Sequence, residues 1–333
     1  MVSKKDPNLL GHRSARPNRA TLRDVAEAAG VSVWTASNTF SNPDRVAEAT
    51  RERVLAAADS LDYAGPNPGA RTLALGRTGM VALIAPQDAQ PLLTDPGASL
   101  VAQGLLAICD RADLSLVLAG RDGEQAVDGR VFLRNTPDAA ARGPTVVVDT
   151  VADGTPSIHA EAATAAAALA RLLIDLGHRR IAVIASPGQD DRLEAAGEVL
   201  RQLGPVPVYR TVGAPWPTGA HGEIAARQAL RATPRPTAIL ALSDQLALGA
   251  IGAVQQMGLK VPDDVSITGL DDLPRSDQRG LTTAWIPYRP MGELAGRVLL
   301  ARIAGEPSPP LSPLPAPLVI RGTTAAPPSD STS

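Results

Sequence analysis

The chain is poor in several features that mark common classes of protein. Its 333 residues include one cysteine, so no intrachain disulfide can form, which is typical of a reducing compartment. Aromatic residues make up only 2%, so alanine, leucine and valine must fill the core. No apolar run approaches the ~18 residues of a membrane span. The basic opening stretch MVSKKDPNLLGHRSARPNRA lacks the apolar core of a signal peptide, and we expect a cytoplasmic protein.

Sequence signatures of catalysis and metal binding are also missing. The chain contains no G-x-G-x-x-G, P-loop, H-E-x-x-H or G-x-S-x-G pattern. Four scattered histidines and one cysteine do not form a metal-ligand pattern, and His178 is interpreted as a turn residue. We therefore expect no catalytic residue, no metal and no cofactor.

The net charge of −2 conceals an uneven distribution. Residues 1–79 hold 11 Lys and Arg against 8 Asp and Glu, and the remainder holds 21 against 26. A basic front end on an acidic body favours a polyanionic partner, although a solvated basic tail would give the same pattern. Residues 1–20 have almost no apolar side chains and are predicted to be a disordered arm.

The stretch TLRDVAEAAGVSVWTASNTF, residues 21–40, predicts two short helices in a helix-turn-helix. The Thr21 hydroxyl can accept from the amide of Asp24 in a capping box. Gly30 can end the first helix because a left-handed residue there has no steric cost. Ser32 can then cap a second helix over about 33–40. Apolar side chains at helical spacing form the expected inner face, namely Leu22, Val25, Ala26, Ala29, Val31, Ala36 and Phe40.

The outer face of the second helix is expected to contact DNA in the major groove. Asn38 can pair with adenine through two hydrogen bonds, and Val33 and Trp34 can meet thymine methyl groups or sugar edges. Thr35 and Ser37 are candidates for phosphate contacts, which set register rather than sequence. The alternative interpretation is that Trp34 is simply a core aromatic residue of a small helical domain.

A third helix is predicted from Glu48 to about residue 61, followed by the proline-containing segment YAGPNPGARTLALGRTG at 63–79. This segment is a poor isolated helix, but residues 70–75 are helix-capable. It is either a plain linker or a hinge that folds only on DNA, where Leu73 could wedge between base pairs from the minor groove.

From residue 79 onward, β-rich runs alternate with amphipathic helices, a pattern typical of parallel sheets covered by helices. Strands are expected at MVALIAP, LSLVLAG, TVVVD, RIAVIA, TAILAL and VSITGL, and helices near 98–112, 162–176, 190–203 and 244–257. Ligands in such folds bind beyond the carboxyl ends of strands. Polar residues at those ends, which suit a polyhydroxylated ligand, are Asp149, Ser186, Ser243, Asp244 and Asp271. Trp216 could stack on a sugar-like face, whereas each Asp could instead be a helix cap.

Several of these motifs together resemble the lac-repressor/galactose-repressor (LacI/GalR) family of bacterial transcription factors. The matching pieces are TLRDVAEAAGVS, ATRERVLAAADSLDY, PNPGARTL, GRTGMVALI, LGHRRIAVIA and the run from PTAILALSD to ITGLDD. The resemblance implies a homodimer that places two recognition helices in successive major grooves of a pseudopalindromic operator. It also implies paired hinge helices and an effector-binding core similar to periplasmic sugar-binding proteins, with two α/β subdomains joined by three crossovers.

The resemblance also assigns expected sites. The DNA-contacting residues would be Thr21, Ser32, Val33, Trp34, Thr35, Ser37, Asn38, Asn67, Arg71 and Leu73. The effector-binding residues would be Asp149, Ser186, Glu194, Trp216, Ser243, Asp244 and Asp271. The expected domains are a basic arm at 1–20, a DNA-binding domain at 21–65, a hinge at 66–78, an effector and dimerisation domain at 79–322 and a disordered tail at 323–333.

The chain departs from the family pattern at several positions. Asn38 stands where many members have Arg, Ala47 replaces the usual Ser cap of the third helix, and Ala160 replaces a larger ligand-contacting side chain. Glu194 occupies a position usually held by an Arg that holds ligand hydroxyls or a carboxylate, and this charge reversal argues against an ordinary sugar or acidic effector. The stretch 120–130 is short, so one helix of the first subdomain would be trimmed or missing.

The sequence therefore predicts a DNA-binding regulator, a repressor in the first instance, that responds to a small molecule and is nucleoid-associated when bound. The principal alternative is a regulator that has lost its effector response, which Glu194 and the short 120–130 stretch would favour. A sugar-binding or transport protein would need export, and an enzyme would need a nucleophile or base constellation that the sequence does not show.

Overall fold

A computed structural model describes residues 20–41, 43–63, 77–121, 126–138, 142–211 and 216–329 of the chain. These residues form two compact units, which divide between Thr78 and Gly79. The predicted hinge contacts Asn67, Arg71 and Leu73 lie outside the described residues. Each unit is described below by itself.

The first unit is a bundle of three short helices, α1 (Leu22–Ala28), α2 (Val33–Ser41) and α3 (Glu48–Ser60). A 3₁₀ turn at Pro43–Arg45 connects α2 to α3. Thr21 and Asp24 form the predicted capping box, with each side chain accepting from the other residue's backbone amide. Gly30 follows α1 in the left-handed conformation, with φ at 64°. The Ser32 hydroxyl accepts from the Thr35 amide at 3.0 Å and caps α2.

Small apolar side chains from all three helices make the core of this unit. Val25, Ala36 and Val54 are fully buried, because the predicted inner faces of the helices meet at these positions. Phe40 and Tyr63 close one side of the core in an edge-to-face contact with ring centroids 5.8 Å apart. These contacts hold α2 against the rest of the bundle.

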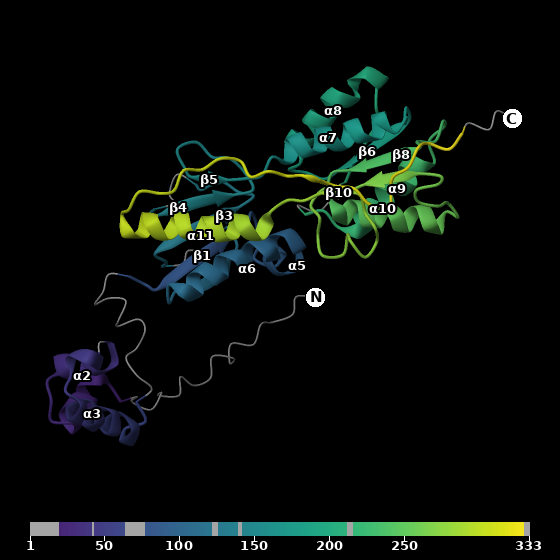
Figure 1. The fold of residues 1–333 in the computed structure, drawn as a ribbon. Coiled ribbons are helices and arrows are strands. Elements are labelled where there is room, and N and C mark those ends of the chain that lie inside the picture. Colours follow the sequence, from purple (N-terminus) through teal and green to yellow (C-terminus); the bar gives the residue numbers. More distant parts are fainter. Residues whose placement is uncertain are drawn as a thin grey trace, which may run out of the picture. The chain divides into compact units, whose positions relative to one another are not determined.

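The second unit contains two α/β subdomains, each built on a parallel sheet (Figure 1). The first sheet has the order β2-β1-β3-β4-β5. Its strands are β1 (Met80–Ile84), β2 (Ser115–Ala119), β3 (Gly129–Leu133), β4 (Thr145–Val148) and β5 (Ser157–Ile158). Helices α5 (Pro91–Thr94), α6 (Pro96–Arg111) and α11 (Tyr288–Ala304) belong to this subdomain, and α6 lies against α11. A β-carbon at Gly104 of α6 would overlap the Arg289 carbonyl oxygen of α11, so the two helix backbones touch.

The opposite face of the first sheet has little helical cover. The β2–β3 and β3–β4 connections contain no helix among their described residues, as the short 120–130 stretch suggested. A small apolar cluster of Ala82, Ile84, Phe132 and Val147 lies on this face. It is separate from the main core, which lies under α6 and α11.

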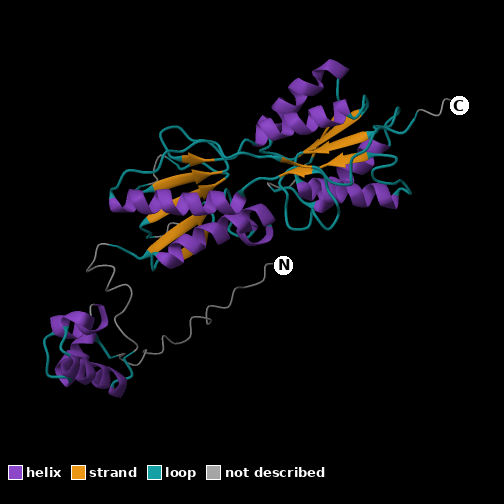
Figure 2. Ribbon diagram, in the orientation of Figure 1, coloured by secondary structure: helices purple, strands orange, loops and turns teal. Residues whose placement is uncertain are grey.

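The second sheet has the order β7-β6-β8-β9 and is also parallel throughout. Its strands are β6 (Ile181–Ala185), β7 (Val208–Arg210), β8 (Ala238–Ala241) and β9 (Ser266–Thr268). Helices α7 (Ala162–Asp175) and α8 (Asp190–Leu200), the latter followed by a 3₁₀ turn at Arg201–Leu203, cover one face. Helices α9 (Gly219–Leu230) and α10 (Asp244–Gln256) cover the other face, giving three layers (Figure 2).

The chain passes between the two subdomains three times, which places the ligand-binding strand ends opposite one another. It crosses between β5 and α7, again between β10 (Thr283–Ala284) and α11, and finally from α11 to β11 (Leu318–Val319). Strands β10 and β11 pair antiparallel, and this two-stranded ribbon lies beside the last two crossings. The three crossings agree with the architecture that the sequence resemblance implied.

The C-terminal segment is ordered further than the sequence predicted. The Thr323 hydroxyl accepts from the Thr282 amide at 2.9 Å. The Ala325 carbonyl lies 2.9 Å from Nε2 of His178, which is fully buried and whose Nδ1 contacts the Thr237 hydroxyl. The expectation of a disordered tail from residue 323 is therefore wrong for this part. Its backbone groups find partners in the second subdomain, which composition alone could not reveal.

In the described residues, no helix is both long and apolar enough to span a bilayer.

Candidate DNA-reading helix and ligand cleft

The first turn of α2 presents a large apolar surface to solvent. Trp34 is 70% exposed and Val33 is 45% exposed, even though both are hydrophobic. The alternative interpretation of Trp34 as a core aromatic residue is therefore wrong in this structure. The buried face of α2 is instead made by Ala36 and Phe40, as the helical spacing predicted.

Asn38 does not point outward, which corrects the sequence prediction. Its side chain is 8% exposed, and Nδ2 donates to the Trp34 carbonyl at 3.1 Å. Thr39 makes the equivalent bond to the Thr35 carbonyl, also at 3.1 Å. Short polar side chains in helices often bond backward to the preceding turn. Helical position alone placed Asn38 on the outer face, but this local bond turns the amide back along the helix.

The hydroxyl residues near α2 have structural partners. The Ser32 and Thr35 hydroxyls lie 2.8 Å apart, and Thr21 is committed to its capping box with Asp24. Ser37 is half-buried. Ser32 and Thr21 remain exposed at the ends of their helices, where a phosphate could also reach them.

A polar cleft of about 600 Å³ lies between the two subdomains of the second unit. Four of the expected effector residues line it, namely Asp149, Trp216, Ser243 and Asp271. Asp149 and Asp271 follow β4 and β9, and Ser243 caps α10, so each is positioned by the carboxyl end of a strand. Ala160 also lines the cleft.

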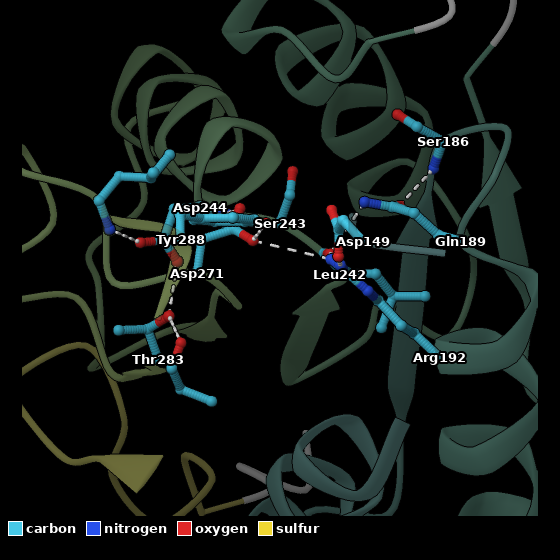
Figure 3. Close-up of polar contacts among 12 residues, drawn as sticks. Asp149, Ser186, Gln189, Arg192, Leu242, Ser243, Asp244, Asp271, Thr283 and Tyr288 are labelled. Carbon is cyan, nitrogen blue, oxygen red and sulfur yellow. Dashed lines mark hydrogen bonds and ion pairs between the residues drawn. The ribbon is translucent and has the colours of Figure 1, made fainter. Parts of the chain in front are cut away.

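Two other predicted residues have structural roles outside the cleft. Ser186 is fully buried, and its hydroxyl lies 2.9 Å from that of Thr211. Asp244 is also fully buried, and its carboxylate accepts from the Leu273 amide at 2.9 Å and the Thr283 hydroxyl at 2.6 Å. Figure 3 shows this carboxylate grouped with Thr283. Asp244 anchors the loop after β9 and does not itself line the cleft.

The prediction for Glu194 is wrong. Glu194 is exposed on α8 and does not line the cleft. Arg192, two residues earlier on the same helix, is 8% exposed and does line it. Two residues correspond to more than half a helical turn, so the two side chains leave α8 in different directions. Arg192 therefore supplies the cleft with the arginine that the family pattern leads us to expect there.

A second arginine, Arg134, lies directly after β3 and contacts four other side chains of the cleft. Its Nε lies 2.6 Å from the Asp149 carboxylate, and Nη1 lies 3.3 Å from that of Asp95. Its guanidinium carbon is 4.8 Å from the Trp216 ring centroid and 5.5 Å from that of Tyr288. Burial opposes the charge of Arg134, but the Asp95 and Asp149 carboxylates keep its pKa well above the ordinary value.

Arg192 joins the two sides of the cleft. Its guanidinium lies 3.8 Å from Asp149, which belongs to the first subdomain, and 3.7 Å from Asp271 in the second. It also donates to the Leu242 carbonyl at 3.4 Å, and Gln189 donates to the same carbonyl at 2.9 Å (Figure 3). Arg192 and Arg134 therefore share the Asp149 carboxylate between them.

The carboxyl group of Asp271 has a pKa that is moved into the neutral range. Burial, together with the nearby Asp244 carboxylate, outweighs the attraction of Arg192 and raises the pKa of Asp271 to about 7. The Tyr288 hydroxyl donates to this carboxyl group at 2.7 Å. Burial and the neighbouring Asp271 raise the pKa of Tyr288 well above its ordinary value, so it remains a donor.

Three cleft residues have left-handed backbone conformations. The φ angles are 51° at Arg134, 59° at Asp149 and 150° at Asp271. Non-glycine residues in this region cost about 1–3 kcal/mol each and cluster at ligand-binding sites. The strained positions coincide with the three strand ends that supply the charged groups, so the fold keeps these side chains aimed into the cleft.

The balance of charge limits what the cleft can bind. Four aspartates line it, Asp95, Asp149, Asp191 and Asp271, against the two arginines already described. Both arginines are paired with aspartates, so an anion would have to displace a carboxylate. His159 also lines the cleft, and its buried Nδ1 has no hydrogen-bond partner among the described residues.

Sequence reasoning missed Arg134, Arg192, Asp95, Tyr288, Gln189 and His159 as lining residues. Strand β3 was not predicted, so the charged residue that follows it was never inspected. Asp95 and Tyr288 stand at the beginnings of α6 and α11, far apart in sequence. A general inspection of helix beginnings, as well as strand ends, would have found both.

The three-helix bundle at residues 20–63, which we call the head, and the cleft of the second unit together define a class of protein. This class is the DNA-binding transcriptional regulators with a periplasmic-binding-protein-like domain. Residues 21–67 match the model of bacterial regulatory proteins of the lacI family, and residues 170–324 match a periplasmic binding protein-like domain. An HTH-type transcriptional regulator of Mycobacterium tuberculosis is 33% identical, covering 93% of this chain and 98% of that protein. The HTH-type transcriptional repressor CytR of Escherichia coli K12 is 31% identical, covering 92% and 97%.

Solved structures lead to the same family. A lac repressor dimer bound to operator and the anti-inducer ONPF has a TM-score of 0.77 at 29% identity, covering 92% of this chain and 99% of that one. The regulator CelR in complex with cellobiose has a TM-score of 0.65 at 29% identity, covering 92% and 100%. The chain belongs to the lacI family of bacterial regulatory proteins, and it is a DNA-binding transcriptional regulator. The members of this family are regulators, not enzymes. In the part of the chain that the structure describes, no cluster of His, Cys, Asp or Glu could hold a metal ion.

Proposed function

We propose that the protein is a repressor that binds a pseudopalindromic operator as a homodimer and is controlled by a small ligand in the cleft. The observation that carries this proposal is that both subdomains supply charged groups to one cleft. Asp149 and Arg134 come from the first subdomain, and Arg192 and Asp271 come from the second. A ligand that bonds to both sets changes the free energy of closing the cleft, which is the physical requirement for coupling.

The chemistry of the cleft favours a neutral, hydroxyl-rich ligand or one that carries a cationic group. The charged and amide side chains of the lining can bond to hydroxyl groups, and the cleft volume lies within the usual range of small-molecule sites, about 300–1,000 Å³. Sugar phosphates and dicarboxylates are disfavoured because neither Arg134 nor Arg192 is without a carboxylate partner. The relative crystallised with cellobiose supports a ligand of the polyhydroxylated kind.

Homodimerisation is supported by the lac repressor dimer on its operator, the relative with a TM-score of 0.77. Two-fold symmetry in the protein requires a matching two-fold arrangement of half-sites in the DNA. Thermodynamic reciprocity then applies to the two binding sites. A ligand that weakens operator binding must bind more weakly to the operator complex than to the free protein, and both affinities change by the same factor, typically about 5–150-fold.

The proposal can be tested in two stages. Selection of bound duplexes from random DNA should yield sites with two-fold symmetry, and sedimentation should show a dimer on each. Calorimetry with a panel of sugars, nucleosides, amino sugars and sugar phosphates should then find a ligand that changes the operator dissociation constant at least fivefold. Asymmetric selected sites bound by single chains would refute the dimer, and a bound ligand without effect on DNA affinity would refute the control.

A second candidate is a regulator that acts without a ligand. The specific observation in its favour is that the Arg192–Asp149 ion pair and the Arg134–Trp216 contact already connect the subdomains. The short connection between β2 and β3 is compatible with it, whereas Glu194 no longer supports it. If no member of the panel binds while operator selectivity is intact, this second candidate replaces the first.

A further inference from the structure

The reading surface of α2 is apolar where most recognition helices are polar. The sequence VWTASNTFS of α2 contains no charged residue and no Gln. Its two most exposed side chains with described burial are Trp34, at 70%, and Val33, at 45%. Both belong to the first turn, which is the part of a recognition helix that contacts base edges.

The polar side chains of α2 that could read a base are turned inward or engaged. Asn38 is the one side chain of the helix that could bond a base edge bidentately, and its amide is buried against the Trp34 carbonyl. The Thr39 hydroxyl is buried against the Thr35 carbonyl, and the Thr35 hydroxyl contacts that of Ser32. Asn38 and Thr39 are only 8% and 5% exposed, so hydrogen-bond readout by either would require its side chain to turn outward.

Thymine is the base that offers an apolar group in the major groove, its C5 methyl. Contact between this methyl and an indole or isopropyl group removes apolar surface from water on both sides. We propose that Val33 and Trp34 read thymine methyl groups, so that operator recognition by this protein depends on methyl contacts at one or two positions in each half-site. This inference rests on the proposed operator binding.

The size of the effect follows from the transfer free energy of one buried methyl group. Loss of one such group should weaken binding by about fourfold in each half-site, and by about 15-fold when both symmetric half-sites lose it. The methyl group can be removed without any change in base pairing, because deoxyuridine differs from thymidine only by this group. Its O4 acceptor stays in the major groove, so a hydrogen-bond reader would not respond.

The experiment uses the full chain and the operator obtained by selection from random DNA. Each thymidine is replaced in turn by deoxyuridine, symmetrically in both half-sites, and dissociation constants are measured by fluorescence anisotropy. A sensitive thymine is then replaced by cytosine and by 5-methylcytosine, which restores the methyl on a different hydrogen-bond edge. We expect a loss of about 15-fold at one or two positions, and tighter binding of 5-methylcytosine than of cytosine at the same positions.

Two variants assign the effect to its side chain. The double variant Val33→Ala/Trp34→Ala should bind thymidine and deoxyuridine operators equally, and the exposure of both side chains means that the fold of the head is retained, which circular dichroism can confirm. Leu55→Ala is the matched control, because Leu55 of α3 is a similarly exposed apolar residue on another helix, at 45%. Leu55→Ala should keep the full deoxyuridine response.

The outcomes separate this inference from the function on which it rests. Equal binding of thymidine and deoxyuridine operators at every position, with selectivity otherwise intact, would overturn methyl readout alone. Undiminished deoxyuridine sensitivity in Val33→Ala/Trp34→Ala would also overturn it. Absence of any preferred duplex in the selection step would overturn the proposed operator binding, and this inference with it.

Discussion

The guanidinium of Arg192 lies 3.8 Å from the carboxylate of Asp149, and this ion pair joins the two subdomains across the ligand cleft. Arg192 is positioned by α8 of the second subdomain and Asp149 by the end of β4 in the first. Both side chains are at most 10% exposed, so solvent screens the pair weakly. A ligand that inserts between them competes with a bond that the protein makes by itself.

The first prediction compares Arg192 with its neighbour Glu194. Arg192→Ala removes the buried cation that pairs with Asp149 and Asp271, and it should lower the free energy of unfolding by about 3–5 kcal/mol at pH 8, where Asp271 is ionised. Glu194→Ala changes an exposed residue on the same helix and should stay within about 0.5 kcal/mol of the parent. Urea denaturation followed by circular dichroism measures both. Equal destabilisation by the two variants would contradict the assignment of Arg192 to the cleft.

The second prediction concerns the pairing of Arg134 with Asp95. Arg134→Met should destabilise the second unit by about 3–5 kcal/mol, because it leaves buried carboxylates without this cation. The double variant Arg134→Met/Asp95→Asn should be more stable than Arg134→Met, since Asn removes one uncompensated charge and still caps α6. Thermal unfolding would show the recovery. A double variant less stable than the single one would mean that Asp95 does not depend on Arg134.

The third prediction is a dependence of stability on pH. Asp271 has a pKa of about 7 in the folded chain, above its ordinary 3.8, so the folded state holds its proton more tightly than the unfolded state. Its contribution to stability is therefore present below about pH 4 and is lost as the pH rises through 7. Asp271→Asn keeps an acceptor for Tyr288 and should flatten this part of the profile. Urea midpoints measured from pH 4 to pH 8 would test it, and an unchanged slope would be the contrary result.

The fourth prediction separates the two roles of α2 side chains. Asn38→Ala removes a bond within the helix and should lower the stability of the head by about 1 kcal/mol or less, without changing the preferred bases. Trp34→Ala should change the preferred bases with little effect on the stability of the head, because the Trp34 side chain is exposed. Site selection with each variant, alongside thermal melts, measures both effects. A changed base preference in Asn38→Ala would show that the amide leaves its intrahelical bond on DNA.

The fifth prediction concerns the basic arm. Residues 1–19 hold five Lys and Arg and one Asp, whereas residues 20–63 hold four Arg and seven acidic residues. Deletion of 1–19 should therefore weaken operator and non-specific binding together and reduce the slope of log affinity against log salt by up to about 4.5 for each arm, or about 9 for a dimer. Titrations at several salt concentrations measure this slope. An unchanged slope would mean that the arm makes no phosphate contacts.

Much of the fold followed from local patterns. The capping box of Thr21, the left-handed Gly30 and the Ser32 cap fixed the first two helices, because each depends on residues within one turn. The strands at β1, β4, β6 and β8 were predictable because each is a continuous run of apolar residues. By contrast, β3 contains Arg130 and β7 is three residues long, so neither gives a strong local signal.

The candidate sites divided in the same way. Asp149, Ser243 and Asp271 line the cleft because strand ends meet there, as the rule about strand ends and the family resemblance predicted; Trp216, named for its ability to stack on a sugar, lines it too. Asn38 was misplaced because helical spacing gives the direction of a Cβ atom but not the hydrogen bond that its amide then makes. Glu194 was misassigned because an alignment cannot show which of two nearby residues on α8 faces the cleft.

The sequence by itself determined the helix-turn-helix, the alternating α/β pattern and the family, since these rest on periodicity, caps and contiguous motifs. Only the tertiary structure decided that Arg134 and Arg192 share Asp149, and that Trp34 is exposed while Asn38 is not. The physical reason is the distance along the chain over which each kind of interaction acts. Backbone preference and amphipathicity act over a few residues, whereas the cleft is made by side chains from β3, β4, α8 and β9 that meet only after the chain has crossed between subdomains.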